Sequence, residues 1–555
     1  MVLHVQRKGP SPVPPDATQH MVPMRDGVNL ATDVYLPEGQ QAPGATVLTR
    51  LPYDKGDDYA FMPIVARYFT ARGYRVVVQD VRGKFRSEGE TLLFVNEAHD
   101  GHDTIDWIVD QPWSDGVVGM WGDSYYGYTQ WAAASTAHPA LRAMVPRVTG
   151  TRLGELPVPI PGQRQHDVEM SVHRFYPLTI FHERDTLEWD LDWSRRPLAD
   201  AVEEFFDHMG SRSPSYDAWF PDPTLLDRFP EGSPFDAPAV PVLMTIGMWD
   251  NCAPWQWSDH EELQRRPDWA RCEYLLIEAI DHENHSHFEL DDPKHASASP
   301  EALARYLDPA VEFFDVFLRG ADTSIPRVRW HLANSGDPTV RADDNWPPTG
   351  TVEVALYLAG AAASAASAPG GSLAEERGEP ESATWVHDPA ACVPSPVENP
   401  FAFLAEYPDE RALADRADVL CFSGGLLDEP LDLVGPVRLA AEVMSDGPEM
   451  DVFVRLLDVD SSGAAHLVAR GEQTVLTADG AHRAVIDLGH LGYRVPAGHS
   501  LRLTVASSDF PEFVPAPGTG EHRWLASRTR HNRQSLALGG ADGAMLSLSV
   551  LPPAR

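Results

Sequence analysis

The residues best suited to chemistry surround Ser124, in the stretch Gly119-Met120-Trp121-Gly122-Asp123-Ser124-Tyr125-Tyr126-Gly127-Tyr128. A serine on a sharp turn between a buried strand and a helix exposes its hydroxyl above the sheet. The N-terminus of that helix then lies beside any negative charge that forms there. The usual spacing of such a turn is Gly-x-Ser-x-Gly, whereas here the second glycine, Gly127, comes one residue late. The stretch predicts a nucleophilic serine if its neighbours form a parallel sheet.

Strands and helices alternate around this turn. Apolar strands separated by amphipathic helices imply a parallel sheet that is covered on both faces. The pattern predicts strands at 45–51, 74–81, 117–121, 141–148, 239–248 and 272–280, and helices at 59–72, 97–109 and 300–319.

The last two of these strands end beside Asp250 and His282. Active-site groups in open parallel sheets collect at the carboxyl ends of strands. The chain order Ser124, Asp250, His282 is that of nucleophile, acid and base in the α/β-hydrolases. A serine hydroxyl is a poor nucleophile until an imidazole takes its proton, and the imidazole needs a carboxylate to hold its tautomer. The sequence therefore predicts an α/β-hydrolase fold with a catalytic triad.

Each of these residues also has a structural explanation when it is taken alone. A serine in a glycine-rich turn is usually structural, and an aspartate after a strand is usually a turn or helix N-cap residue. The segment 281–287 carries His282, His285 and His287, and such a cluster could bind a metal. His282 is the favoured base because it comes first after the strand, and His285 is the alternative. With the histidine given to the triad, we expect no metal and no cofactor.

Several stretches resemble the superfamily of serine hydrolases that contains cocaine esterase, X-prolyl dipeptidyl peptidase and α-amino-acid ester hydrolase. The elbow of that superfamily is itself Gly-x-Ser-Tyr-x-Gly, so a late glycine is expected within it. Its base commonly sits in a Gly-Pro-Trp-x-His turn, which is here Glu278-Ala279-Ile280-Asp281-His282. The other matching stretches are the opening hairpin at 22–28 and 33–37, Pro52-Tyr53-Asp54-Lys55, Gln111-Pro112-Trp113 and the acid turn Gly247-Met248-Trp249-Asp250.

This resemblance implies an oxyanion hole made by the hydroxyl of Tyr53 and the backbone N–H of Tyr125. Acyl transfer develops negative charge on the carbonyl oxygen, and each preorganised donor there is worth about 3–4 kcal/mol. Without the resemblance, Tyr53 would be interpreted as a strand-end aromatic residue that packs on the core.

Composition and net charge indicate which partners the protein can bind and in which compartment it works. The chain has 555 residues and a formal net charge of −38, which suggests two to four domains and argues against binding to nucleic acid or anionic membranes. Its four cysteines are widely spaced, which suggests neither a zinc site nor a disulfide framework and fits a reducing compartment. We find no signal-peptide pattern and no apolar run near the ~20 residues of a membrane span. The expectation is a cytoplasmic protein, with a homodimer left open.

The domain organisation follows from changes in composition. Aromatic residues at helical-looking spacing (Trp189, Trp193, Phe205, Phe206 and Trp219) predict a helical cap, and the small, polar residues 359–381 predict a flexible linker. Closely spaced β-rich runs beyond it suggest a β-sandwich or a jelly roll, and the resemblance to the superfamily implies a jelly roll. The expected domains are the hydrolase domain at 1–149 and 238–345, the cap at 150–237 and the jelly roll at 346–555.

Three functions are compatible with these features. The favoured one is a serine hydrolase that cleaves an ester or amide bond of a small-molecule or peptide-like substrate through an acyl-enzyme on Ser124. The alternative is an X-Pro dipeptidyl aminopeptidase or α-amino-acid ester hydrolase, in which Asp281, Glu283 or acids of the cap would hold the substrate ammonium. An alternative of another class is a non-catalytic binding protein, against which the intact triad argues.

Overall fold

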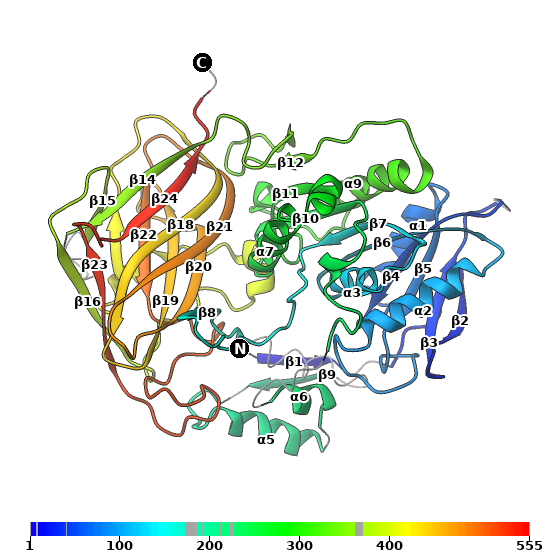
Figure 1. Ribbon diagram of the computed structural model, residues 1–555, viewed down its shortest axis with the longest axis horizontal. Helices are drawn as coiled ribbons and strands as arrows, with labels where there is room; N and C mark the ends of the chain where they lie inside the picture. Colours follow the sequence, from blue (N-terminus) through cyan, green and yellow to red (C-terminus); the bar gives the residue numbers. More distant parts are fainter. Residues whose placement is uncertain are drawn as a thin grey trace.

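The computed structural model describes residues 2–6, 9–39, 42–171, 186–190, 192–210, 212–220, 227–360 and 370–553. Figure 1 shows a half built from a helix-covered sheet beside a half built almost entirely of strands. The elements α5, α6, β1 and β9 lie along one side of both halves.

A ten-stranded mixed sheet forms the core of the first half, in the order β13-β12-β11-β10-β7-β6-β4-β5-β3-β2. Its seven central strands are parallel, while the hairpin β2–β3 and the edge strand β13 add antiparallel pairs. The strands are β2 Ala17–Pro23, β3 Asn29–Tyr35, β4 Gly44–Leu51, β5 Arg75–Asp80, β6 Ser114–Asp123, β7 Leu141–Arg147, β10 Val242–Trp249, β11 Glu273–Asp281, β12 Val328–Trp330 and β13 Arg341–Asp343.

Helices cover both faces of this sheet, each face closed by its own apolar cluster. On one face α1 (Met62–Thr70) and α9 (Pro300–Arg319) pack on the sheet through Phe69, Phe313 and Phe314. On the other face lie α2 (Glu97–Val109), α3 (Ser124–Ser135), α7 (Ala253–Gln264) and α8 (Pro267–Cys272). This is the α/β-hydrolase arrangement that the sequence predicts.

The predicted helices at 97–109 and 300–319 are confirmed residue for residue. The helix expected at 59–72 is shorter, because Phe61 adopts a left-handed conformation with φ 39° and the helix begins only at Met62. Pro63, at the start of that helix, suits the first turn because its missing N–H would have had no intrahelical acceptor.

The insertion between β7 and β10 contains β8 (Gln165–His166), β9 (Thr186–Asp190), α5 (Ala199–Met209) and α6 (Pro214–Trp219). Trp189 lies in β9 and not in the predicted helix, because this segment pairs antiparallel with β1 (Val2–Gln6). Phe205 and Phe206 do lie on α5, and their cluster is completed by Trp524 from the strand-rich half. Residues 172–185, 191, 211 and 221–226 of the predicted cap lie outside the described residues.

The second half is the β-rich domain that the sequence predicts; its jelly-roll topology stays a prediction. Its strands pair mostly antiparallel, and β18, β19, β20 and β21 are the longest. They are β14 Val352–Ala359, β15 Gly371–Ala374, β16 Glu381–His387, β17 Leu420–Ser423, β18 Leu431–Ser445, β19 Glu449–Val459, β20 Ala465–Leu476, β21 His482–Val495, β22 Ser500–Ala506, β23 Asn532–Leu538 and β24 Met545–Val550.

The prediction of a flexible linker at 359–381 is wrong for Gly371–Ala374. These residues form β15, which lies between β14 and β17. A Cβ atom at Gly371 would lie 2.5 Å from the ring of Phe422. The glycine therefore allows two strands to approach closely, and its presence does not indicate flexibility here. Residues 361–369 of the predicted linker lie outside the described residues.

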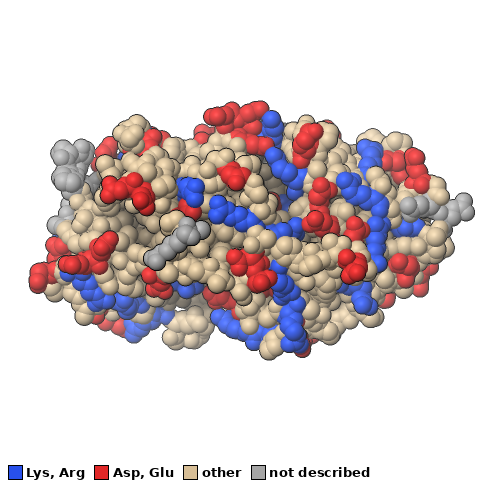
Figure 2. All heavy atoms as spheres, turned by 90° about the horizontal axis from the view of Figure 1, so that it is seen from above, with Lys and Arg blue, Asp and Glu red and all other residues tan. Residues whose placement is uncertain are grey.

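Acidic and basic side chains are interspersed on the face shown in Figure 2. Many of them form surface ion pairs, such as that between Arg212 and Glu203. Among the helices that the structure describes, none combines the length and the apolar character that a membrane crossing requires.

Candidate active site

Ser124 stands where β6 ends and α3 begins, and its backbone has a left-handed φ of 50°. Such strain in a serine is typical of a nucleophile turn, because it lifts the hydroxyl away from the sheet. Two glycines make room for this turn. A Cβ at Gly122 would lie 2.1 Å from the ring of Tyr126, and one at Gly127 would lie 2.6 Å from Thr149.

The structure brings Ser124, Asp250 and His282 together at the carboxyl ends of β6, β10 and β11. The Nε2 atom of His282 lies 3.0 Å from the Ser124 Oγ, and its Nδ1 lies 2.7 Å from the Asp250 Oδ1. The backbone N–H of Cys252 also donates to that Asp250 oxygen, at 2.9 Å. With the Nδ1 proton directed at the carboxylate, Nε2 is the atom that can accept the serine proton.

The other two histidines of the cluster point elsewhere. His285 pairs with Asp281, with its Nδ1 3.1 Å from the carboxylate. His287 is buried and stacks on Trp249 with ring centroids 4.8 Å apart. Burial lowers the pKa of His287 to about 4, so that its ring is neutral at pH 7.

Two groups of described side chains have the spacing that a metal ion requires. One consists of Asp250, Cys252 and His282, of which Asp250 and His282 are already hydrogen-bonded to each other within the triad. The other consists of His102, Asp106 and His138. In that second group the Nδ1 of His138 accepts the N–H of Ala140, so the proton of the neutral ring is on Nε2, 2.9 Å from Asp106. A ring nitrogen that carries a proton has no lone pair for a metal.

The pKa of His282 depends on the burial of its ring and on the acidic groups beside it. Burial of the ring alone would lower the pKa of His282, whereas the neighbouring Cys252 and Asp250 raise it, and the net direction is upward. Burial raises the pKa of the Cys252 thiol to about 11, so the thiol is neutral at pH 7. Because the thiol is neutral at pH 7, the Cys252 contribution to the pKa of His282 is absent there, and Asp250 is the charge that stabilises a protonated His282.

The two expected oxyanion donors occupy the same region. Tyr53 follows β4 and lines one pocket with Ser124 and His282, where its ring meets that of Tyr126 edge-on at 6.2 Å. Tyr125 is the second residue of α3, so its N–H belongs to the first turn, whose donors have no intrahelical acceptor. Its side chain is buried, and its hydroxyl donates to Glu97 at 2.8 Å.

The pocket above Ser124 has a volume of about 50 Å³ and largely aromatic walls. Glu283 lines this pocket, and the hydroxyl of Tyr59 donates to its carboxylate at 3.4 Å. Asp281, in contrast, is completely buried, and its carboxylate already accepts hydrogen bonds from the main chain and from His285. The aromatic walls come from Tyr53, Tyr59, Phe61, Tyr126 and Tyr306.

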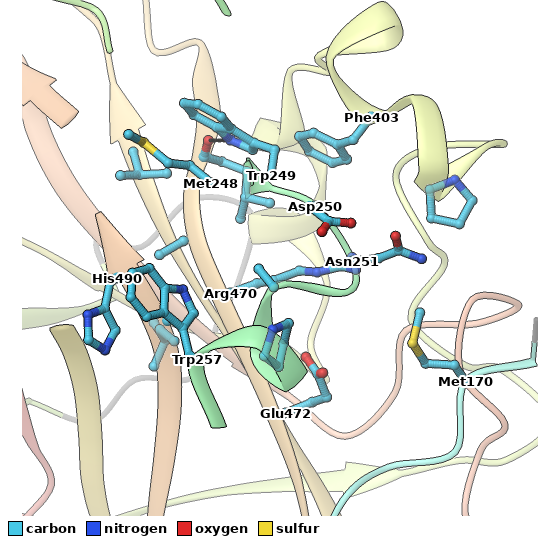
Figure 3. Close-up of a pocket in the computed structure, with 18 of the residues that line it drawn as sticks. Met170, Met248, Trp249, Asp250, Asn251, Trp257, Phe403, Arg470, Glu472 and His490 are labelled. Carbon is cyan, nitrogen blue, oxygen red and sulfur yellow. Dashed lines mark hydrogen bonds between the residues drawn. The ribbon is translucent and has the colours of Figure 1, made fainter. Parts of the chain in front are cut away.

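Behind the acid, the turn after β10 lies at the junction of the two halves. Figure 3 shows Asp250 and Asn251 there, next to Phe403, Arg470 and Glu472 of the β-rich domain, which line a cavity of about 60 Å³ with them. The indole N–H of Trp249 donates to the Leu467 carbonyl at 3.0 Å, which joins the acid turn to β20.

Sequence reasoning missed the residues that surround the triad. Asp123 lines the same pocket as Ser124, and its carboxylate accepts a hydrogen bond from Asn284, on the turn of His282. Phe401 places its ring 4.9 Å from that of His282. No local motif marks Phe401, which meets the site from a distant part of the chain, and the role of Asp123 depends on its contact with Asn284, 161 positions away.

Two family models match long segments of this chain. The model described as X-Pro dipeptidyl-peptidase (S15 family) matches residues 26–284, and the one described as X-Pro dipeptidyl-peptidase C-terminal non-catalytic domain matches residues 320–541. The cocaine esterase of Rhodococcus sp. (strain MB1 Bresler) is 30% identical over 544 residues, which cover 91% of this chain and 92% of that protein.

Solved structures show the same fold at lower identity. An aminopeptidase from the marine sediment archaeon Thaumarchaeota archaeon superposes with a TM-score of 0.78 at 22% identity, covering 97% of both chains. An α-amino acid ester hydrolase superposes with a TM-score of 0.73 at 24% identity, covering 96% of both chains. Both similarities extend over the sheet-and-helix half and the β-rich half together.

Proposed function

This chain belongs to the hydrolase superfamily of cocaine esterase, the X-Pro dipeptidyl-peptidases and the α-amino-acid ester hydrolases, and from that premise we propose that it is a serine hydrolase that forms an acyl-enzyme on Ser124. The observation that carries the proposal is the continuous chain of hydrogen-bond distances from the Ser124 Oγ through His282 to Asp250.

The reaction proposed here has two halves. In the first, His282 takes the Ser124 proton as the oxygen attacks the substrate carbonyl, and the resulting imidazolium is stabilised by Asp250. His282 then passes the proton to the leaving alcohol or amine, which departs and leaves an ester on Ser124. In the second half a water molecule gives its proton to His282 and attacks that ester, and the acid is released as Ser124 recovers its proton.

The oxyanion of each tetrahedral intermediate needs donors on the side away from His282. We assign this role to the phenol of Tyr53 and to the N–H of Tyr125. Both come from elements that the sheet fixes in place, the end of β4 and the first turn of α3. Such preorganised donors act most strongly in a pocket that is largely closed to water.

A second candidate function is the cleavage of substrates that carry an ammonium group, as amino-acid esters and aminopeptidase substrates do. The observation in its favour is that Glu283 lines the pocket together with tyrosine rings, one of which, Tyr59, donates a hydrogen bond to it. A carboxylate beside aromatic faces suits a bound cation. Asp281, the other acid that the sequence offered, is occupied by its own hydrogen bonds.

A fluorophosphonate probe tests the first proposal directly. We expect one adduct per chain, on the peptide that contains Ser124, and none in Ser124→Ala. A chain that hydrolyses neither esters nor amides and takes up no probe would instead be the binding protein that the sequence left as an alternative.

Substrate class is tested by comparing matched p-nitrophenyl esters that differ only in an α-ammonium group. If Glu283 binds the cation, Glu283→Gln lowers kcat/KM for the ammonium ester and leaves the neutral ester unchanged. Equal effects on both esters would remove the second candidate function while leaving the first intact.

A further inference from the structure

The histidine proposed as base sits at the tip of a tight turn that runs from Asp281 to His285. The N–H of Asn284 donates to the carbonyl of Asp281 at 3.2 Å, and the N–H of Asp281 donates to the carbonyl of His285 at 3.2 Å. His282 occupies the second position of the turn, and Asn284 has a left-handed φ of 63°. A short exposed turn would leave the imidazole free to move, so the contacts that hold this turn decide where Nε2 lies.

One side of the turn is attached to the nucleophile elbow. The side-chain N–H of Asn284 donates to the Asp123 carboxylate at 2.9 Å, and its side-chain oxygen accepts from Arg147 at 2.9 Å. Arg147 in turn donates to the other oxygen of Asp123 at 3.1 Å. Asp123 is bonded directly to Ser124 in the chain, so this triangle joins the residue beside the nucleophile to the turn of the base.

The triangle is buried and balanced in charge. The side chains of Arg147 and Asp123 are 2% and 6% exposed. Tyr306, on α9, donates a further hydrogen bond to Asp123 at 2.7 Å and lies under the Arg147 guanidinium, 4.6 Å from its ring centre. Burial alone would lower the pKa of Arg147, but Asp123 and Glu278 raise it, so the guanidinium stays charged. Charge-assisted hydrogen bonds in such a setting are short, directional and costly to break.

The opposite side of the turn is attached to the β-rich domain. The N–H of Leu404 donates to the Asp281 carboxylate at 2.9 Å, and the N–H of Glu283 donates to the carbonyl of Phe401 at 3.1 Å. The ring of Phe401 also packs against His282. These contacts come from the short helical segment Pro400–Glu406, whose Leu404 is anchored in the core of the β-rich domain.

We propose that Asn284 and Asp281 are positioning residues for His282, Asn284 by attaching its turn to the nucleophile elbow and Asp281 by attaching it to the β-rich domain. Neither residue takes part in proton transfer; both act through the place they give to the imidazole. The proposal rests on the role of His282 as base. The β-rich domain then contributes to catalysis, because its residues Phe401 and Leu404 contact the turn that carries His282.

The first test removes the attachment to the elbow. Asn284→Gly deletes the side chain but keeps a residue that tolerates a positive φ. The matched control is Asn334→Gly, which replaces another asparagine of positive φ (58°) whose side chain is hydrogen-bonded to Tyr493 and to the Arg494 carbonyl. A misplacement of about 1 Å can cost about 10²-fold in rate. We expect a loss of that order in kcat for Asn284→Gly, with KM nearly unchanged, and wild-type kcat for the control.

The second test removes the attachment to the β-rich domain. Asp281→Asn keeps the shape of the side chain but replaces one carboxylate oxygen by an NH₂ group. That group then faces the N–H of Leu404 or of His285, so one of these two hydrogen bonds is lost. We expect kcat to fall again while KM is kept. Combined with Asn284→Gly, the loss should differ from the product of the two single losses, because both changes act on one turn.

Folding is controlled separately, by thermal unfolding and by active-site titration with a fluorophosphonate run to completion, so that kcat is given per reactive serine. Tyr306→Phe removes one hydrogen bond to Asp123 and replaces Asn284→Gly as the test if that variant does not fold. It should also lower kcat. Wild-type kcat per titrated site in the folded variants would overturn the positioning proposal. If His282→Ala itself kept activity, the proposed function would fail instead, which distinguishes the two.

Discussion

The imidazole of His282 lies 3.0 Å from the hydroxyl of Ser124, although 158 positions separate the two residues in the chain. The two segments that carry them come from different strands of one parallel sheet, β6 and β11, and meet at its carboxyl edge. Asp250 completes the arrangement from β10, which lies next to β11.

Replacing the nucleophile should abolish turnover and spare the fold. Ser124→Ala is expected to lower kcat by about 10⁶-fold, since loss of a triad member commonly has that effect. Its hydroxyl contributes little to packing, so the midpoint of thermal unfolding should stay near the wild-type value. Steady-state rates on p-nitrophenyl acetate, with the unfolding midpoint as control, check both halves. Activity well above background would show that the nucleophile is another residue.

The three histidines after β11 should differ sharply in their importance. His282→Ala is expected to cripple the enzyme, whereas His285→Ala and His287→Ala should be milder in kcat. His287 is buried against Trp249, so its truncation should lower the free energy of unfolding instead. Rates and unfolding curves for the three variants, measured side by side, test the order. A larger loss of kcat in His285→Ala than in His282→Ala would contradict it.

Removing one hydroxyl should expose the role of Tyr53. Tyr53→Phe keeps the ring and its edge-on contact with Tyr126, so packing should be nearly unchanged. Loss of one oxyanion donor typically lowers kcat by about 10²–10³-fold. The variant should still react, slowly, with a stoichiometric phosphonate. Turnover at the wild-type rate would show that the phenol is only a packed aromatic group.

The pH dependence should report the charge of Asp250. A base must be unprotonated to accept the serine proton, so kcat/KM should rise with pH through the pKa of His282. Because that pKa is raised above the ordinary histidine value, the rising limb should lie at higher pH than for a free imidazole. In Asp250→Asn the limb should move to lower pH, with a reduced plateau. An unmoved limb would mean that another group titrates.

Chelation should leave the enzyme active. The triad uses the histidine best placed for a metal, and His138 presents a protonated nitrogen to Asp106. Activity on an ester should therefore survive dialysis against EDTA, and added Zn²⁺ should not raise it. Loss on dialysis that Zn²⁺ reverses would require a metal site.

Local patterns along the chain were enough to predict six of the ten strands of the sheet. The segments that form β4, β5, β6, β7, β10 and β11 are apolar because both faces of a parallel sheet are buried. The segments that form α2 and α9 have apolar residues at helical spacing along their whole length. Since the carboxyl ends of such strands share one edge, the residues that follow them could be expected to meet. That argument is local at each strand end, which is why Ser124, Asp250 and His282 could be named together.

Only the tertiary structure decided what holds those residues. The hydrogen bond from Asn284 to Asp123 joins residues 161 positions apart, and the one from Leu404 to Asp281 joins residues 123 positions apart. No periodicity or motif in the sequence marks either pair. Hydrogen bonds of this kind depend on how whole elements pack. The same holds for β15, where Gly371 admits the ring of Phe422, and for Trp189, which pairs through β9 with the N-terminal strand. Composition describes a segment by itself, whereas these placements depend on the partner it meets.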